Sequence, residues 1–196
     1  PDEEYPNATI TNFEDVFREV SGGRRLRRVG MVGMEQMRYG VHKQMMDGFS
    51  GVELVDITDD FLKLRYIKSE WEIAQMAEAF KIADACYQAM REAVKPGARE
   101  YEVAAAGEAV ARRAGASGFG FKTIVGSGPP SDAVVPTALD RVMNDGEMVM
   151  VGIAPQVRGY NGCMGDTLPV SGEYTPAQAE VHRRLRETLH KTRELL

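Results

Sequence analysis

In the chain of 196 residues, two side chains between residues 147 and 170, Cys163 and Asp166, could act as a nucleophile or a base in a cleft. Cys163 could be a nucleophile if a basic neighbour lowered the pKa of its thiol, or it could be a small apolar residue of a strand. Asp166 could act as a general base, or it could face solvent or pair with a cation such as Arg158. Asp132, in an expected loop, is a further candidate base. The residue types alone leave these alternatives open.

Short extended segments must position these side chains. Residues 148–153 are almost wholly apolar and lie between a turn signal and a proline, which is typical of a strand buried on both faces. A second expected strand covers residues 156–160 and leads into the loop dipeptide Asn161-Gly162, and a third covers residues 164–170. The strand ends converge on one loop of small residues, where we expect the functional site.

The composition of the chain sets broad limits on its function. The length allows one large domain or two small ones with a real core. A net charge of -5 and a pI near 5.3 give no reason to expect a nucleic-acid partner. The local exception is a basic cluster, which we interpret as a solvated flank of a turn, with an anionic partner as the alternative. The cluster consists of Arg24, Arg25, Arg27 and Arg28.

The two cysteines and the hydropathy pattern indicate a compartment. Cys86 and Cys163 lie far apart in different expected elements, so a disulfide framework is not indicated, and reduced thiols suit a cytoplasmic protein. No apolar run approaches the roughly 20 residues of a membrane span, and we expect no membrane contact. Because the chain opens at Pro1 without an initiator Met, we interpret it as a fragment or a processed piece.

Helices and strands are expected to alternate at the start of the chain. The periodicity predicts a short helix near residues 12–20, a strand over residues 27–33, a helix over residues 34–48 and a strand over residues 52–57. This rhythm is typical of an α/β fold.

The segment of residues 65–73 has the signature of a helix start. Ser69 can cap the helix, Glu72 stands three residues later as its capping-box partner, and Ile67 can pack against Ile73. Beyond this segment we expect three helices and one further strand. The helices are expected over residues 70–94, 100–114 and 174–195, and the strand over residues 119–126.

The order and spacing of these features resemble the creatinase/aminopeptidase family of M24 peptidases, whose fold is called pita-bread. Residues 65–73 match its junction R-x-I-K-S-x-x-E-I at every fixed position, and Pro96-Gly97 with Glu100 match its P-G-x-x-E signature. The pattern is closest to creatinase and to Xaa-Pro dipeptidase and aminopeptidase, truncated after about half of the architecture. The junction joins domains and is expected to carry no chemistry.

The resemblance implies an α/β (α+β) fold in two parts. Residues 1–66 correspond to the C-terminal part of a creatinase-like N-terminal domain. Residues 67–196 correspond to the first half of a pita-bread catalytic domain, in which a mostly antiparallel sheet is backed by two helices. The second half, which supplies further metal ligands in the family, is absent from this sequence.

The metal ligands of the family are replaced in this chain. In the family, two Asp residues bind a pair of metal ions, and they fall here on Gly152 and Cys163 when the sequences are aligned without gaps. Glycine has no side-chain donor, and a lone Cys is a soft ligand poorly suited to replace a bridging carboxylate. We therefore expect no metal and no cofactor at these two positions.

Other family site positions are replaced as well. The catalytic His and a substrate-binding Glu of creatinase fall on Val135 and Gly165, and an Arg of the family becomes an Asp. His182 and His190 lie too far apart for a helical metal pair, and we expect both to be solvated. The side chains that remain at the site are expected to bind substrate, and they are Tyr160, Asn161, Cys163 and Asp166.

Three functions are compatible with this pattern. The first is a metal-independent, creatinase-like hydrolase that cleaves a C–N bond of a small molecule or a dipeptide. The second is a catalytically inactive pita-bread module that binds a peptide or a small molecule. The third is a metal-dependent Xaa-Pro peptidase, which ranks last because the lost carboxylates leave too few hard ligands for two divalent ions.

The expected strands also predict an assembly. Without the second half of the family fold, the strands at 148–153 and 164–170 would expose apolar surface, which rarely stays bare. We expect a homodimer or a pairing with the missing half, because the two halves of the family fold are related by a two-fold axis.

Overall fold

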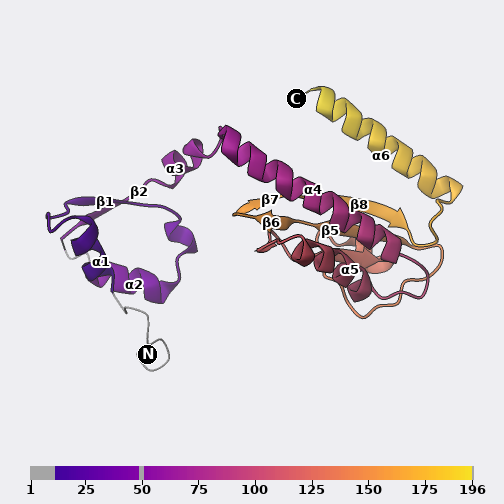
Figure 1. The fold of residues 1–196 in the computed structure, drawn as a ribbon, viewed down its shortest axis with the longest axis horizontal. Helices are drawn as coiled ribbons and strands as arrows, with labels where there is room; N and C mark the ends of the chain where they lie inside the picture. Colours follow the sequence, from indigo (N-terminus) through magenta and orange to yellow (C-terminus); the bar gives the residue numbers. More distant parts are fainter. Residues whose placement is uncertain (1–11, 49–50, 196) are drawn as a thin grey trace. The chain divides into compact units, whose positions relative to one another are not determined.

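The structure is a computed structural model that describes residues 12–48 and 51–195 (Figure 1). The chain divides into two compact units, residues 1–68 and residues 69–196. No helix in the part of the chain that the structure describes is long and apolar enough to cross a membrane.

The first unit contains a parallel pair of strands. β1 (Arg28–Met31) pairs with β2 (Glu53–Asp56), and α2 (Tyr39–Gly48) lies in the crossover between them, as a parallel pair requires. α1 (Phe13–Val20) is capped by Asn12, whose Oδ1 accepts a hydrogen bond from the backbone N of Asp15 at 2.9 Å. These elements confirm the expected alternation of helices and strands.

Two details of the first unit differ from the prediction. The helix expected over residues 34–48 is broken into η1 (Met34–Gln36) and α2, because Met37 has an extended backbone with ψ of 133°. An additional helix, α3 (Thr58–Leu64), follows β2. The side chain of Thr58 accepts a hydrogen bond from Gly33 N at 2.9 Å and so ties α3 to the loop after β1.

Two long helices begin the second unit. α4 (Glu70–Ala93) starts with the predicted capping box of Ser69 and Glu72. α5 (Glu100–Arg113) packs closely on α4, since a Cβ added at Gly107 would lie 2.6 Å from Cγ of Met90. Cys86 is completely buried on α4, as expected for a small apolar residue.

An antiparallel sheet with the order β4-β5-β8 lies against these helices (Figure 1). Its strands are β4 (Ile124–Ser127), β5 (Met148–Ile153) and β8 (Met164–Pro169). One face of the sheet packs into the core with α4 and α5 through Val125, Val149, Val151, Ile153 and Leu168. The opposite face is free for a site. The mixed fold and the helix-backed antiparallel sheet confirm the predicted fold class.

A second small sheet and two further elements complete this unit. The small sheet has the order β3-β6-β7, formed by β3 (Gly118–Phe119), β6 (Pro155–Val157) and β7 (Tyr160–Asn161). η2 (Pro129–Asp132) follows β4, and α6 (Pro176–Glu194) ends the described chain. The strand predicted over residues 119–126 is therefore split between two sheets, β3 and β4.

The hairpin after β5 turns earlier than predicted. Val157 pairs with Tyr160, so the two-residue turn is Arg158-Gly159, where φ is 49° and 88°. Positive φ at both positions suits the tight turn of an antiparallel hairpin. The prediction placed the loop at Asn161-Gly162, and this was wrong because Gly162 serves a close approach to α4 and not a turn.

Candidate functional site

An open cleft of about 420 Å³ lies on the face of the β4-β5-β8 sheet that points away from α4 and α5. The strands form its floor and α6 forms a wall. The cleft brings together four positions that the sequence singled out, Gly152, Cys163, Gly165 and Asp166, and α6 adds further residues such as His182.

The floor of the cleft has little side-chain cover at its centre. Gly152 of β5 is the direct register partner of Gly165 of β8, so both lie on the same face of the sheet. A Cβ added at Gly152 would lie 3.3 Å from Cδ1 of Ile124, and one added at Gly165 would lie 3.2 Å from the carbonyl oxygen of Val151. The backbone itself therefore forms this part of the floor.

The residues at the two metal positions do not fit the metal pair of the family. Gly152 offers no donor and Cys163 offers one exposed thiol, whereas a pair of divalent ions needs several hard oxygen ligands. Within residues 12–48 and 51–195, no group of three or more His, Cys, Asp and Glu side chains is arranged to hold a metal ion.

Tyr160 and Asn161 are both engaged with neighbouring parts of the chain. Tyr160 donates a hydrogen bond from Oη to Oε1 of Glu72 at 2.9 Å, and its ring meets the Trp71 ring edge to face at 5.8 Å. The Asn161 side chain lies over Gly120, where an added Cβ would be 2.9 Å from its Cγ. Along this segment the lining of the cleft begins at Cys163.

The Asp166 carboxylate is turned toward α4. Tyr87 of α4 donates a hydrogen bond from Oη to Oδ2 of Asp166 at 2.7 Å, and Oδ1 accepts one from Thr167 N at 2.8 Å. Burial of the phenol and the adjacent carboxylate together raise the pKa of Tyr87 to about 12. The partner of Asp166 is thus a tyrosine 79 residues away and not Arg158.

His182 is a site residue that the sequence did not reveal. It was expected to be solvated, but it is half-buried and stacks on Tyr174 with ring centroids 4.8 Å apart. Tyr174 in turn donates a hydrogen bond from Oη to the Thr167 carbonyl at 3.2 Å, and Gln178 donates one to the Gly146 carbonyl at 3.1 Å. These contacts fix the start of α6 beside the sheet. The one sequence feature that could have indicated this position of His182 is Tyr174, an aromatic residue just before the start of α6.

Val135 lies in an exposed loop whose two ends are held by one carboxylate. Glu100 is fully buried and accepts hydrogen bonds from Ser127 N at 2.8 Å, Ser127 Oγ at 2.7 Å and Leu139 N at 3.0 Å. Asp132 is exposed in η2 of the same loop. The P-G-x-x-E signature identified Glu100, but its partners are 27 and 39 residues away and were not predictable.

An ion pair supports the base of this loop. Arg141 donates hydrogen bonds to Ser127 Oγ at 2.6 Å and to both carboxylate oxygens of Glu147, at 2.5 and 2.8 Å. The guanidinium holds the pKa of the Glu147 carboxyl at about 2, well below its ordinary value of 4.5. Both side chains are about four-fifths buried.

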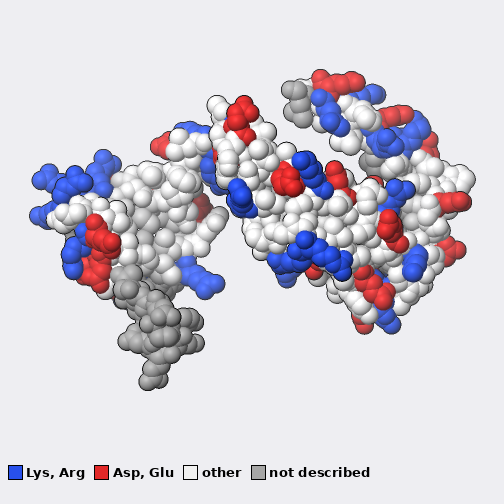
Figure 2. Space-filling view, viewed as in Figure 1, with Lys and Arg blue, Asp and Glu red and all other residues white. Residues whose placement is uncertain are grey.

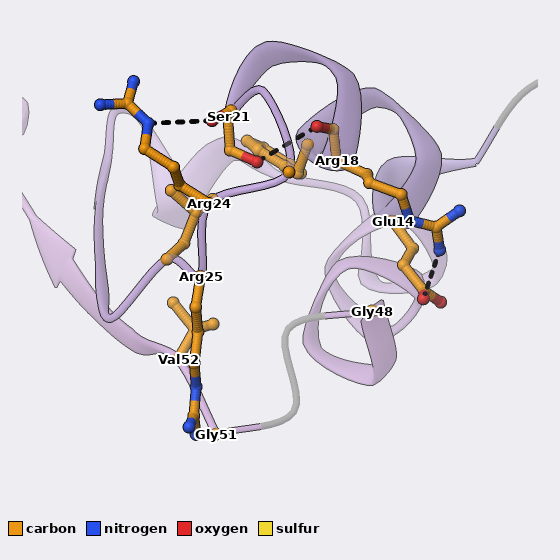
Figure 3. A pocket seen from close by; sticks show the side chains of 11 residues that line it. Glu14, Arg18, Ser21, Arg24, Arg25, Gly48, Gly51 and Val52 are labelled. Carbon is orange, nitrogen blue, oxygen red and sulfur yellow. Dashed lines mark hydrogen bonds and ion pairs between the residues drawn. The ribbon is translucent and has the colours of Figure 1, made fainter.

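Two members of the basic cluster of the first unit, Arg24 and Arg25, line a hollow of about 310 Å³ (Figure 3). Arg24 donates a hydrogen bond to the Ser21 carbonyl at 3.1 Å, and Arg28 pairs with Glu53 at 3.0 Å. Figure 3 shows the guanidinium groups of Arg24 and Arg25 pointing apart, and Figure 2 shows Asp and Glu atoms beside the Lys and Arg atoms on the visible surface. This arrangement fits the solvated interpretation better than a shared anion site.

Comparison with known proteins decides the family. Residues 74–196 match metallopeptidase family M24. The chain belongs to this family. The uncharacterized peptidase YqhT of Bacillus subtilis is 35% identical over 131 residues, which cover 66% of this chain and 37% of the relative. The Xaa-Pro aminopeptidase of Escherichia coli is 28% identical over 83% of this chain and 36% of its own length.

Other relatives confirm the predicted resemblance. A creatinase of a Bacillus species is 29% identical over 84% of this chain and 42% of its own length. The prolidase structure from Pyrococcus furiosus has a TM-score of 0.78 and 26% identity over 92% of this chain and 51% of that structure. The prolidase from Pyrococcus horikoshii has a TM-score of 0.80 over 97% and 56% of the two chains. The chain thus spans about half or less of the length of these relatives.

Proposed function

We propose that this M24 protein is a metal-independent hydrolase that cleaves a C–N bond of a small molecule or a dipeptide. One observation carries the proposal. The two positions that the family resemblance assigns to metal ligands, Gly152 and Cys163, both line the cleft. A cleft lined by glycine backbone, one thiol, mostly apolar strand side chains and side chains of α6 is suited to an organic ligand and poorly suited to a pair of divalent ions.

The cleft offers polar groups at two separate places. Cys163 stands at one end of β8, and His182 is held near Thr167 by its stacking on Tyr174. Three residues of β8 lie between Cys163 and Thr167, so the two positions are about 13 Å apart along the extended chain. A dipeptide spans at most about 7 Å, so a ligand of that size lying along β8 would contact either the thiol or the imidazole but not both.

We further propose an identity for each of the two units and a partner for the sheet of the second unit. The first unit corresponds to the end of a creatinase-like N-terminal domain, with a boundary near residue 66, and the second to the first half of a pita-bread domain. The β5 and β8 face is proposed to pair with a second copy or with a second pita-bread half. The relatives named as Xaa-Pro aminopeptidase and creatinase support a peptide-like or small-molecule substrate.

The experiment that tests the hydrolase proposal is a turnover assay with and without a chelator. The purified protein is incubated with a panel of Xaa-Pro dipeptides and small guanidino acids, in EDTA and in Mn²⁺, and products are identified by mass spectrometry. We expect cleavage that is equal under both conditions. His182→Gln should reduce it, whereas His190→Gln, on the same helix but outside the cleft lining, should not. Cleavage that appears only with Mn²⁺ would support a metal-dependent Xaa-Pro peptidase instead.

A specific observation favours a binding module as the second candidate. The Asp166 carboxylate is occupied by Tyr87, and Cys163 and His182 stand at opposite ends of the cleft, so no nucleophile and base lie in contact there. A module of this kind would show ligand-dependent thermal stabilisation without any product. Stabilisation together with product formation supports the hydrolase.

A further inference from the structure

The segment that carries Cys163 into the cleft is fastened to α4 at two points. Residues 160–163 follow the tight hairpin turn and lead directly into β8. The first point is the Tyr160 side chain and the second is the Gly162 backbone. Both lie within the second unit, so the fastening belongs to one compact body.

The first point is a hydrogen bond from Tyr160 to the start of α4. Oη of Tyr160 donates to Oε1 of Glu72 at 2.9 Å, and the Trp71 ring packs edge to face on the tyrosine ring at an interplanar angle of 80°. The bond is shielded, since Tyr160 is half-buried. A hydrogen bond with an ionised acceptor is stronger than one between neutral groups.

Glu72 uses its two oxygens for two different purposes. Oε2 accepts hydrogen bonds from Ser69 N at 2.7 Å and Ser69 Oγ at 2.9 Å, which closes the capping box, while Oε1 accepts the bond from Tyr160. The capping box orients the carboxylate because it fixes the first turn of the helix. The junction motif, which seemed to serve only the helix start, therefore reaches a segment 88 residues further along the chain.

The second point is the contact of Gly162 with the middle of α4. A Cβ added at Gly162 would lie 2.3 Å from the carbonyl oxygen of Ala79 and 2.5 Å from the backbone N of Phe80. No side chain fits at such a distance from backbone atoms. Gly162 is buried, whereas the next residue, Cys163, is exposed and lines the cleft.

We propose that Glu72 is a positioning residue for the cleft, which holds Tyr160 and thereby fixes the segment that presents the Cys163 thiol. Residues 160 and 161 are also paired with β6, and Gly162 N donates a hydrogen bond to the Pro155 carbonyl at 3.1 Å. Loss of the Tyr160 bond would therefore loosen the segment without freeing it, and Cys163 would become more mobile at the cleft edge. Any effect of Glu72 on substrate binding rests on the proposed function, but its effect on the position of the Cys163 thiol does not.

The test uses a nitroxide spin label on Cys163 of the whole protein. The chain has two cysteines, and Cys86 is completely buried with its thiol pKa raised by burial, so the label attaches at Cys163. Cys163→Ser should remove the signal. The width of the electron paramagnetic resonance spectrum reports the mobility of the segment on the nanosecond scale.

We expect Tyr160→Phe and Glu72→Ala to narrow the spectrum, while Glu72→Gln, which keeps an acceptor oxygen, should stay close to the parent. Glu70→Gln is the matched control, because it changes a neighbouring exposed carboxylate and leaves Ser69, Glu72 and Tyr160 in place; it should leave the spectrum unchanged. A parental spectrum for Tyr160→Phe would overturn the proposal, and so would equal narrowing in Glu70→Gln. Since no substrate is present, failure of the hydrolase proposal would not alter this outcome.

Discussion

Gly152 and Gly165 face each other directly across β5 and β8, on the side of the sheet that α4 and α5 leave open. The family resemblance assigns residue 152 to a metal-binding Asp of the peptidases and residue 165 to a substrate-binding Glu of creatinase. With glycine at both positions, neither carboxylate is present on the floor of the cleft, and Cys163 places a thiol at the position assigned to the second metal-binding Asp.

Restoring the two carboxylates should create a metal site. We expect the double variant Gly152→Asp with Cys163→Asp to bind Mn²⁺ detectably by isothermal titration calorimetry, because Mn²⁺ prefers carboxylate oxygens. The single variants and the parent should show much weaker binding. The added side chain at residue 152 must displace Ile124 by a few tenths of an ångström, so a small loss of stability is expected. Parental Mn²⁺ binding as tight as that of the double variant would refute this interpretation.

Tyr87→Phe should destabilise the protein by about 1 to 2 kcal/mol, because Asp166 loses the donor for its half-buried carboxylate. Chemical denaturation measures this loss, and Tyr101→Phe, at a half-exposed tyrosine of α5, is the matched control. Since the pKa of Tyr87 is raised to about 12, its contribution is present below pH 10 and is lost as the pH rises through 12. Equal losses in the two variants would contradict the prediction.

The ion pair of Glu147 and Arg141 should make stability depend on acid pH. The pKa of Glu147 is lowered from 4.5 to about 2, so its stabilisation is complete above pH 4.5 and disappears as the pH falls toward 2. The shift corresponds to roughly 3 kcal/mol of unfolding free energy. Arg141→Met should make the unfolding free energy depend less on pH in this acid range. An unchanged slope between pH 5 and pH 2 in that variant would show that other carboxylates cause it.

Assembly of the 196-residue chain should be visible by light scattering. Three leucine and valine side chains follow one face of α6 at four-residue spacing and are more than half exposed, and the adjoining part of the cleft is apolar. They are Val181, Leu185 and Leu189. We expect a mass well above the 21.6 kDa of one chain at micromolar concentration. Leu185→Glu should lower the mass measured by light scattering. A well-behaved monomer at 21.6 kDa would remove the basis for the homodimer.

The parts of the fold that were predicted from the sequence depend on neighbouring residues. The capping box needs only Ser69 and Glu72, three residues apart, and the apolar run of β5 and the Pro96-Gly97 stop are equally local. The hairpin turn was missed because Arg158 adopts a positive φ that its residue type does not suggest, while Asn161-Gly162 looked like the better turn.

The arrangement of the site depends on contacts between residues far apart in the sequence, so less of it could be predicted from the sequence. Ungapped alignment to the family motif was enough to place Gly152, Cys163 and Gly165 at one cleft. Three contacts form only when the strands and helices pack together. They are the hydrogen bond of Tyr87 to Asp166, the hydrogen bond of Tyr160 to Glu72 and the stacking of His182 on Tyr174. Tyrosine hydroxyls have no sequence pattern that names their acceptor, so such pairs can be found only in three dimensions.

Elemental analysis is the direct test of the proposal that this M24 protein works without the metal pair of its family. The purified protein is dialysed against metal-free buffer and its Mn, Co, Fe and Zn contents are measured per chain. We predict contents well below one ion per chain, equal in the parent and in Cys163→Ala. A stoichiometric transition metal in the parent that is abolished by Cys163→Ala would contradict the claim.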